Sequence, residues 1–138
     1  MGLERFHEQQ QHYYPIALRE MRQGYKQSHW IWFIFPQLAS LGHSRNAIYY
    51  GIRDLQEAAD YMRDPILRKN LLEITRVLLE LPSCDPCYVM SSSLDARKLR
   101  SCMTLFSQAA PEEPIFRAVL DKFFEGQPDN ATLRLLRR

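Results

Sequence analysis

Residues 64–82, with the sequence DPILRKNLLEITRVLLELP, carry the clearest structural signal in the chain. Asp64 is a favourable N-cap residue, and Pro65 suits the first helical position, where its fixed φ matches the helix and no N–H is needed. Pro82 then ends the segment. Between these signals, apolar residues recur at helical spacing: Leu67, Leu71, Ile74, Leu78 and Leu81. The stretch therefore predicts a helix over residues 65–81 with one apolar face.

Similar helix start and stop signals divide the rest of the chain into helices. Gly24 favours the end of a first helix, and Pro15 within that helix predicts either a kink or the start of a second segment. Gly51 is expected to break a later helical stretch into two pieces. We expect helices over residues 3–23, 46–62, 93–106 (capped by Ser93) and 115–124, a short turn after Asp85-Pro86 and a last turn after Asp129.

Residues 28–36, SHWIWFIFP, form an ambiguous segment. Aromatic and β-branched residues favour a strand by propensity, but both alternate faces are apolar and no partner strand is evident elsewhere. We interpret the segment as a short buried helix, capped by Ser28 and ended before Pro36, followed by a loop over residues 37–44. No hairpin turn joins alternating runs. The predicted fold class is all-α: residues 1–138 form a single compact multi-helical domain with short helices, proline-punctuated loops and no significant sheet.

The composition describes a folded chain of nearly balanced charge. The 138 residues are 46% hydrophobic and 12% aromatic, and 18 Lys and Arg against 16 Asp and Glu give a net charge of +2. This apolar content with so little net charge excludes a disordered chain, and we do not expect nucleic acid as a partner. The N-terminus has no secretory h-region, and the most apolar stretch, residues 30–35, is far shorter than the roughly 20 residues that span a bilayer. We expect a cytoplasmic protein with no membrane association.

The three cysteines do not predict a metal or cofactor site. Cys84 and Cys87 have CxxC spacing, which is typical of a redox pair or of half a zinc site. A structural zinc ion needs four ligands, and neither a second CxxC nor an HxxxH motif completes the set. We therefore expect no metal ligands and no cofactor. We interpret these cysteines and Cys102 as small, mostly buried, reduced thiols, while a redox role for the CxxC pair stays open.

Familiar catalytic signatures, such as GxSxG, the P-loop, GxGxxG and HExxH, are missing from the sequence. Residues 26–37, KQSHWIWFIFPQ, instead combine a large aromatic surface with polar groups at its edges, as small-molecule sites do. The alternative is that WIWFIF is simply the centre of the core. His29 is the candidate general acid–base, because imidazole titrates near neutrality. The candidate ligand-binding residues of this window are Lys26, Ser28, Trp30, Trp32 and Gln37.

Residues 95–106, DARKLRSCMTLF, form a second candidate window. On a helix, Lys98 and Ser101 share one face, and Arg100 and Thr104 share another. Cations and a hydroxyl on one turn can hold a phosphate or carboxylate, with arginine offering a bidentate fork. These four side chains are therefore candidate ligand-binding residues. The alternative is a solvated cationic face, or a link to Asp95 and to acids on neighbouring helices.

Both windows carry motifs that resemble a known bacterial family. SHWIWFIFPQ at residues 28–37 and KLRSCMTLF at residues 98–106 resemble the hallmarks of the domain of unknown function DUF1810, a family often mislabelled calpastatin. The similarity continues through LERF at residues 3–6 and VLDKFFEG at residues 119–126, and so covers nearly the whole chain. The resemblance implies an all-helical single domain and no established activity.

Two segments depart from this family pattern, at residues 68–70 and 90–95. If the second of these lines a site, the ligand preference of this chain is expected to differ from that of its relatives. The calpastatin label itself does not fit physically, because the calpain inhibitor is a disordered, aromatic-poor chain.

We hypothesise that the protein binds, and transforms if His29 is catalytic, an anionic small molecule such as a nucleotide or ADP-ribose derivative. A fold-level analogy to helical N-glycosidases acting on ADP-ribose derivatives suggests this ligand class. The hypothesis requires the two windows to lie side by side. The alternative is a non-catalytic protein-interaction or adaptor module anchored on exposed aromatics at Tyr49-Tyr50 or Phe123-Phe124. Single-stranded nucleic acid is the least expected ligand, because the net charge is small.

Overall fold

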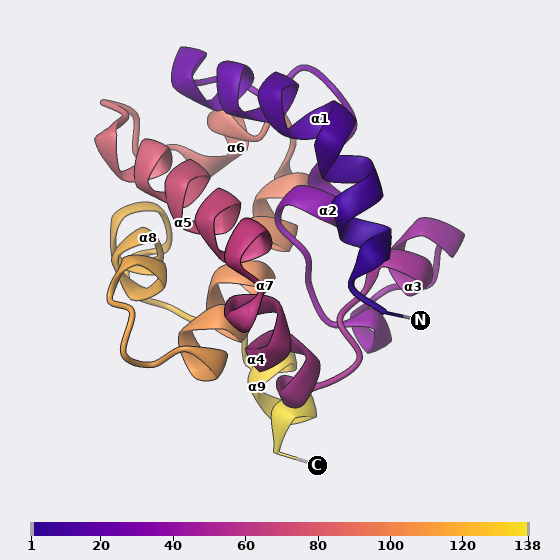
Figure 1. The fold of residues 1–138 in the computed structure, drawn as a ribbon. Coiled ribbons are helices and arrows are strands. Elements are labelled where there is room, and N and C mark those ends of the chain that lie inside the picture. Colours follow the sequence, from indigo (N-terminus) through magenta and orange to yellow (C-terminus); the bar gives the residue numbers. More distant parts are fainter. Residues whose placement is uncertain (1, 138) are drawn as a thin grey trace.

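The structure, a computed structural model, describes residues 2–137 and is helical throughout (Figure 1). The only β-type pairing among these residues is one bridge between Leu38 and Ile52, so the all-α prediction is confirmed. The elements, in order, are α1 (Glu4–Gln23), α2 (Ile31–Ile34), a 3-10 turn η1 (Ala39–Leu41), α3 (Arg45–Tyr50), α4 (Leu55–Arg63), α5 (Pro65–Glu80), α6 (Pro86–Val89), α7 (Ser93–Ala109), α8 (Ile115–Phe124) and α9 (Asn130–Leu136).

Helix α7 is the centre of the fold. It packs against α2, α4, α6, α8 and α9, and Figure 1 shows it passing through the middle of the molecule. Residues 101–106 are all buried, as expected of a helix covered on every side. The Phe106 ring lies 5.2 Å from that of Tyr61 on α4 and 5.8 Å from that of Phe116 on α8. These aromatic contacts fix α7 in the core and leave its N-terminal half to face a surface.

The predicted helix starts and stops are mostly confirmed. The Asp64 carboxylate accepts hydrogen bonds from the N–H groups of Ile66 and Leu67 and so begins α5. Asp129 begins α9 in the same way. Helix α1 continues through Pro15 to a left-handed Gly24, and Figure 1 shows that α1 bends along its length. A bend is the expected result, because proline removes one helical hydrogen bond and clashes with the preceding turn.

Two predicted caps are wrong. Ser28 does not cap α2, which follows Trp30 and has no side-chain cap. The Ser28 hydroxyl instead donates to a carboxylate oxygen of Glu20, 2.5 Å away, because that buried acid offers a stronger, charged acceptor. Helix α7 is capped by Ser92, one residue before the predicted Ser93.

Residues 37–52, which contain η1 and α3, form a closely packed segment rather than an open loop. We refer to its first part, residues 37–47, as the turn. Backbone hydrogen bonds run from Ala39 N–H to the Ile52 carbonyl (2.9 Å) and from Ile52 N–H to the Gln37 carbonyl (2.8 Å). A Cβ added at Gly51 would lie 2.3 Å from the Ala39 Cα, and one at Gly42 would lie 2.3 Å from the Ala47 Cβ. Only glycine allows this close approach of the backbone beside α7.

Candidate functional site

A buried carboxylate organises the chain between α1 and α2. Glu20 accepts hydrogen bonds from the N–H groups of Gln27 (2.8 Å) and Ser28 (3.0 Å), from the Ser28 hydroxyl and from the indole N–H of Trp30 (2.9 Å). Burial would raise the pKa of Glu20, but these hydrogen bonds to its charged form outweigh burial and lower the pKa below the ordinary value. The polar groups of Ser28 and Trp30 therefore serve as hydrogen-bond donors to the Glu20 carboxylate. Trp30 itself is 0% exposed.

A second carboxylate joins the two sequence windows. Asp95, at the start of α7, lies 2.9 Å from Lys26 Nζ through one oxygen and 3.6 Å from Lys98 Nζ through the other. Lys26 Nζ lies 5.0 Å from the Trp30 ring centroid, and Lys98 Nζ lies 4.9 Å from that of Trp32. The windows thus lie side by side, as the sequence hypothesis required. Lys26, however, is only 3% exposed and is held inside by Asp95.

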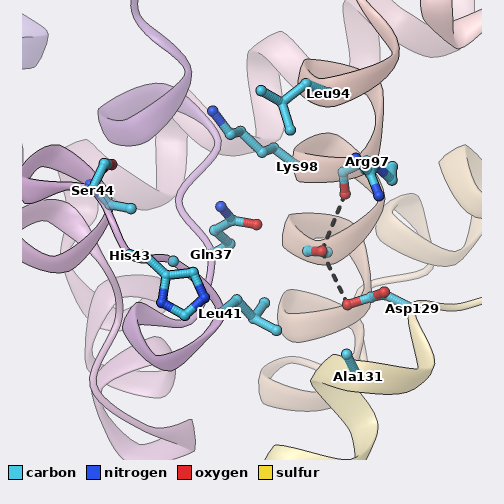
Figure 2. Close-up of a pocket in the computed structure, with 12 residues that line it drawn as sticks. Gln37, Leu41, His43, Ser44, Leu94, Arg97, Lys98, Asp129 and Ala131 are labelled. Carbon is cyan, nitrogen blue, oxygen red and sulfur yellow. Dashed lines mark hydrogen bonds between the residues drawn. The ribbon is translucent and has the colours of Figure 1, made fainter.

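A cleft of about 420 Å³ opens between the turn over residues 37–47, the exposed side of α7 and the start of α9 (Figure 2). Figure 2 shows Lys98 extending from α7 toward the turn, and Arg97 lying on the side nearer Asp129. Apolar side chains lie between the polar ones, as in small-molecule sites. The polar lining residues are Gln37, His43, Ser44, Arg97, Lys98, Ser101 and Asp129, and the apolar ones include Leu41, Ala47, Leu94 and Ala131.

Three of the residues singled out in the sequence line this cleft: Gln37, Lys98 and Ser101. Trp32 is half-buried beside Lys98, although its indole N–H has no hydrogen-bond partner within residues 2–137. His29 is exposed and does not line the cleft, so its position gives no support to a catalytic role.

The remaining candidates serve the structure rather than the cleft. Lys26, Ser28 and Trp30 are bound to acids inside the fold, as described above. Arg100 donates to the Gln127 carbonyl at 2.9 Å and lies over the Phe124 ring. Thr104 is buried, donates to the Arg100 carbonyl and accepts from the Asp129 N–H. None of these side chains lines the cleft, and each makes its polar contacts elsewhere in the fold.

The sequence interpretation missed His43, Ser44, Arg97 and Asp129 as lining residues. A signal for the first pair was present, since Gly42-His43-Ser44 closely follows the SHWIWFIFPQ motif. Asp129 was recognised only as a helix cap. It does cap α9 through the Thr132 N–H, but its Oδ2 also accepts from the Ser101 hydroxyl at 3.0 Å, the contact drawn in Figure 2.

The described residues hold no cluster of three or more His, Cys, Asp or Glu side chains that could bind a metal ion. The expectation of mostly buried thiols is wrong for Cys84 and Cys87, which are exposed. Only Cys102 is buried, in α7, and burial raises the pKa of its thiol. Within residues 2–137, every helix is too short or too polar to cross a bilayer.

Comparison with known proteins places the chain in a family. No curated protein matches it. The solved structure of the conserved hypothetical protein Rv1873 from Mycobacterium tuberculosis is similar, with 37% sequence identity and a TM-score of 0.95 over 99% of this chain and 96% of that one. The profile of the family described as "Protein of unknown function (DUF1810)" matches residues 1–136. The chain therefore belongs to the DUF1810 family.

Proposed function

We propose that the protein binds an anionic small molecule, such as a nucleotide derivative, in the cleft between the turn over residues 37–47 and α7. One observation carries the proposal: the adjacent cations Arg97 and Lys98 of α7 line a cavity whose other wall offers Gln37, His43 and Ser44. Amide, imidazole and hydroxyl groups can all donate hydrogen bonds to an anion, and the two cations add charge-assisted ones.

The charges around the cleft leave positive charge for a ligand. Asp95 is shared between Lys26 and Lys98, so one carboxylate faces two ammonium groups. Arg97 is exposed and forms no ion pair with any residue among 2–137. Asp129 contributes the opposing negative charge on the far side. The balance favours an anion near Lys98.

Contacts within the fold hold both walls of the cleft. The turn is held by the close packing of Gly51 on Ala39 and by the backbone hydrogen bonds to Ile52. Helix α7 is held by its buried residues 101–106. A preformed site loses less conformational entropy on binding, so modest contacts suffice for measurable affinity.

Titration calorimetry with ADP and with inorganic pyrophosphate tests the proposal. Each charge-assisted hydrogen bond is worth about 1.5–3 kcal/mol, so Lys98→Gln and Arg97→Gln should each weaken binding by about tenfold or more. Lys69→Gln, an exposed lysine on α5, is the matched control and should leave affinity unchanged. Absence of binding by both ligands, or equal affinity in all three variants and the parent protein, would overturn the proposal.

A protein-interaction role is the second candidate, favoured by the exposed face of α3. Ile48 is 53% exposed and Tyr49 is 44% exposed, whereas Phe123 is 6% exposed and packs in the core. Of the two aromatic pairs named from the sequence, only Tyr49-Tyr50 therefore presents an accessible aromatic side chain, and the exposed Ile48 lies next to it in the chain. If this role is correct, Ile48→Ser with Tyr49→Ser should abolish co-purification of a defined partner and leave ADP affinity unchanged.

A further inference from the structure

We infer that the cleft has two poles of opposite charge and selects a phosphorylated sugar over a simple anion. The inference rests on the proposed function and names its ligand class. It comes from Asp129, a carboxylate that an anion site would not be expected to expose. Figure 2 shows Asp129 and Lys98 at opposite ends of the cleft.

The first step concerns the carboxylate oxygen of Asp129 that the fold leaves available as an acceptor. Its three side-chain hydrogen bonds, from the Ser101 hydroxyl, the Thr132 N–H and the Thr132 hydroxyl, all reach Oδ2. Within the described part of the chain, Oδ1 accepts no hydrogen bond. An ionised carboxylate only accepts, so Oδ1 can take a donor from a ligand and repels an anionic group placed beside it.

The spacing of the poles is the second step. Asp129 is bonded to Ser101, which follows Lys98 by three residues on α7. Lys98 and Ser101 are therefore about 4.5 Å apart along the axis of α7, and Figure 2 shows the Lys98 side chain extending away from Asp129. A sugar phosphate has hydroxyl groups several bonds away from its phosphoryl group and can reach both poles.

The chemistry of the acidic pole is the third step. Oδ2 of Asp129 already accepts from two hydroxyls, those of Ser101 and Thr132, so this environment is suited to hydroxyl donors. Leu41 and Ala131 line the cleft close by and offer apolar surface to the carbon face of a sugar ring. We assign the phosphoryl group to Lys98 and a sugar hydroxyl to Oδ1 of Asp129.

Calorimetry with three probes tests this assignment: ribose 5-phosphate, n-pentyl phosphate and inorganic phosphate. The first two carry a phosphoryl group on a five-carbon unit, but only ribose 5-phosphate has hydroxyls. We expect ribose 5-phosphate to bind at least about tenfold more tightly than pentyl phosphate, because a site built for a hydroxyl rejects the analogue without one. Asp129→Asn should remove most of this preference and strengthen pentyl phosphate binding, since the repelling charge is gone.

Variants of Asp129 and Lys98 distinguish the sugar phosphate inference from the proposed anion binding. Asparagine is also a good N-cap, so Asp129→Asn should keep α9, and Asp129→Ser, which removes the charge but keeps a cap, is the second variant if the first does not fold. Equal affinity for the two organic phosphates, or an unchanged preference in the Asp129 variants, overturns the sugar phosphate inference and leaves anion binding standing. If none of the three probes binds, or if Lys98→Gln binds all three as the parent protein does, the proposed function itself fails.

Discussion

The segment over residues 26–36 and the cleft beside residues 37–47 contain similar ingredients, yet they use them differently. In the first, Lys26, Ser28 and Trp30 direct their polar atoms to Asp95 and Glu20 inside the fold. In the second, Lys98 and His43 line the open cleft, although Lys98 also faces Asp95 at 3.6 Å. Polar residues beside aromatics therefore mark a binding site only when no buried partner in the fold occupies them.

The largest expected effect is on the first segment. Glu20→Ala leaves the Trp30 indole and the Ser28 hydroxyl without their acceptor inside the fold. We expect a loss of about 1–3 kcal/mol in the free energy of unfolding for each donor left unsatisfied in the interior. Urea denaturation measures it, and Glu8→Ala, an exposed acid on the same helix, is the control. A loss no greater than that of the control would mean that the carboxylate does not organise this segment.

Gly51→Ala is expected to disturb the wall of the cleft. Its Cβ would lie 2.3 Å from the Ala39 Cα and 2.6 Å from the Ala47 carbonyl oxygen, both backbone atoms that yield only if the turn moves. We expect a loss of about 1–3 kcal/mol in unfolding free energy together with weaker ADP binding. Denaturation and calorimetry on the same sample check both. Full stability with unchanged affinity would show that the turn is pliable.

Acid should destabilise the fold through Glu20, the carboxylate that organises the first segment, and through Asp64. The pKa of Glu20 is lowered in the folded state despite burial, because four hydrogen bonds favour its charged form, and the pKa of Asp64 is lowered by its cap hydrogen bonds and by His7. The unfolded chain then takes up protons first, so this stability is present above the unfolded pKa values, near 4, and is lost as pH falls through the lower folded values. Urea unfolding from pH 7 to pH 3 should show the decline, and Glu20→Gln should flatten it. An unaltered slope in that variant would contradict the role of Glu20.

The smallest expected effect is on ADP affinity, and it distinguishes His43 from His29. His43 lines the cleft, so His43→Ala should weaken ADP binding by about threefold to tenfold, the value of one neutral hydrogen bond. His29→Ala should leave binding unchanged, because His29 lies outside the cleft. Calorimetry with both variants distinguishes them. The reverse order of effects would restore His29 to the site and remove the contrast between the two regions.

The fold was predictable because its signals are local. Asp64 and Asp129 cap helices through N–H groups two or three residues away, and Gly24 ends α1 through its own left-handed φ. Ser28 failed as a cap for the opposite reason. Its partner Glu20 lies eight residues earlier on another helix, and no local pattern identifies it.

The site was predictable only in part because its walls meet through the fold. Lys98 and Gln37 could be named from their neighbours in sequence, but Asp129 reaches the cleft through a hydrogen bond to Ser101 across 28 residues. Arg100 was chosen as a phosphate ligand because a helix places its guanidinium fork on one face with the Thr104 hydroxyl. Its guanidinium instead turns to the Gln127 carbonyl, a contact that depends on where the chain returns after α8.

The shared position of Asp95 has a consequence for how the cleft can fill and empty. If the cleft binds an anion as proposed, that anion competes with Asp95 for Lys98 alone, while Lys26 keeps its own oxygen of the same carboxylate. Replacement of Asp95 by the anion at Lys98 thus leaves neither lysine without a negatively charged partner. Occupancy of the cleft can therefore turn over without loosening the packing behind it.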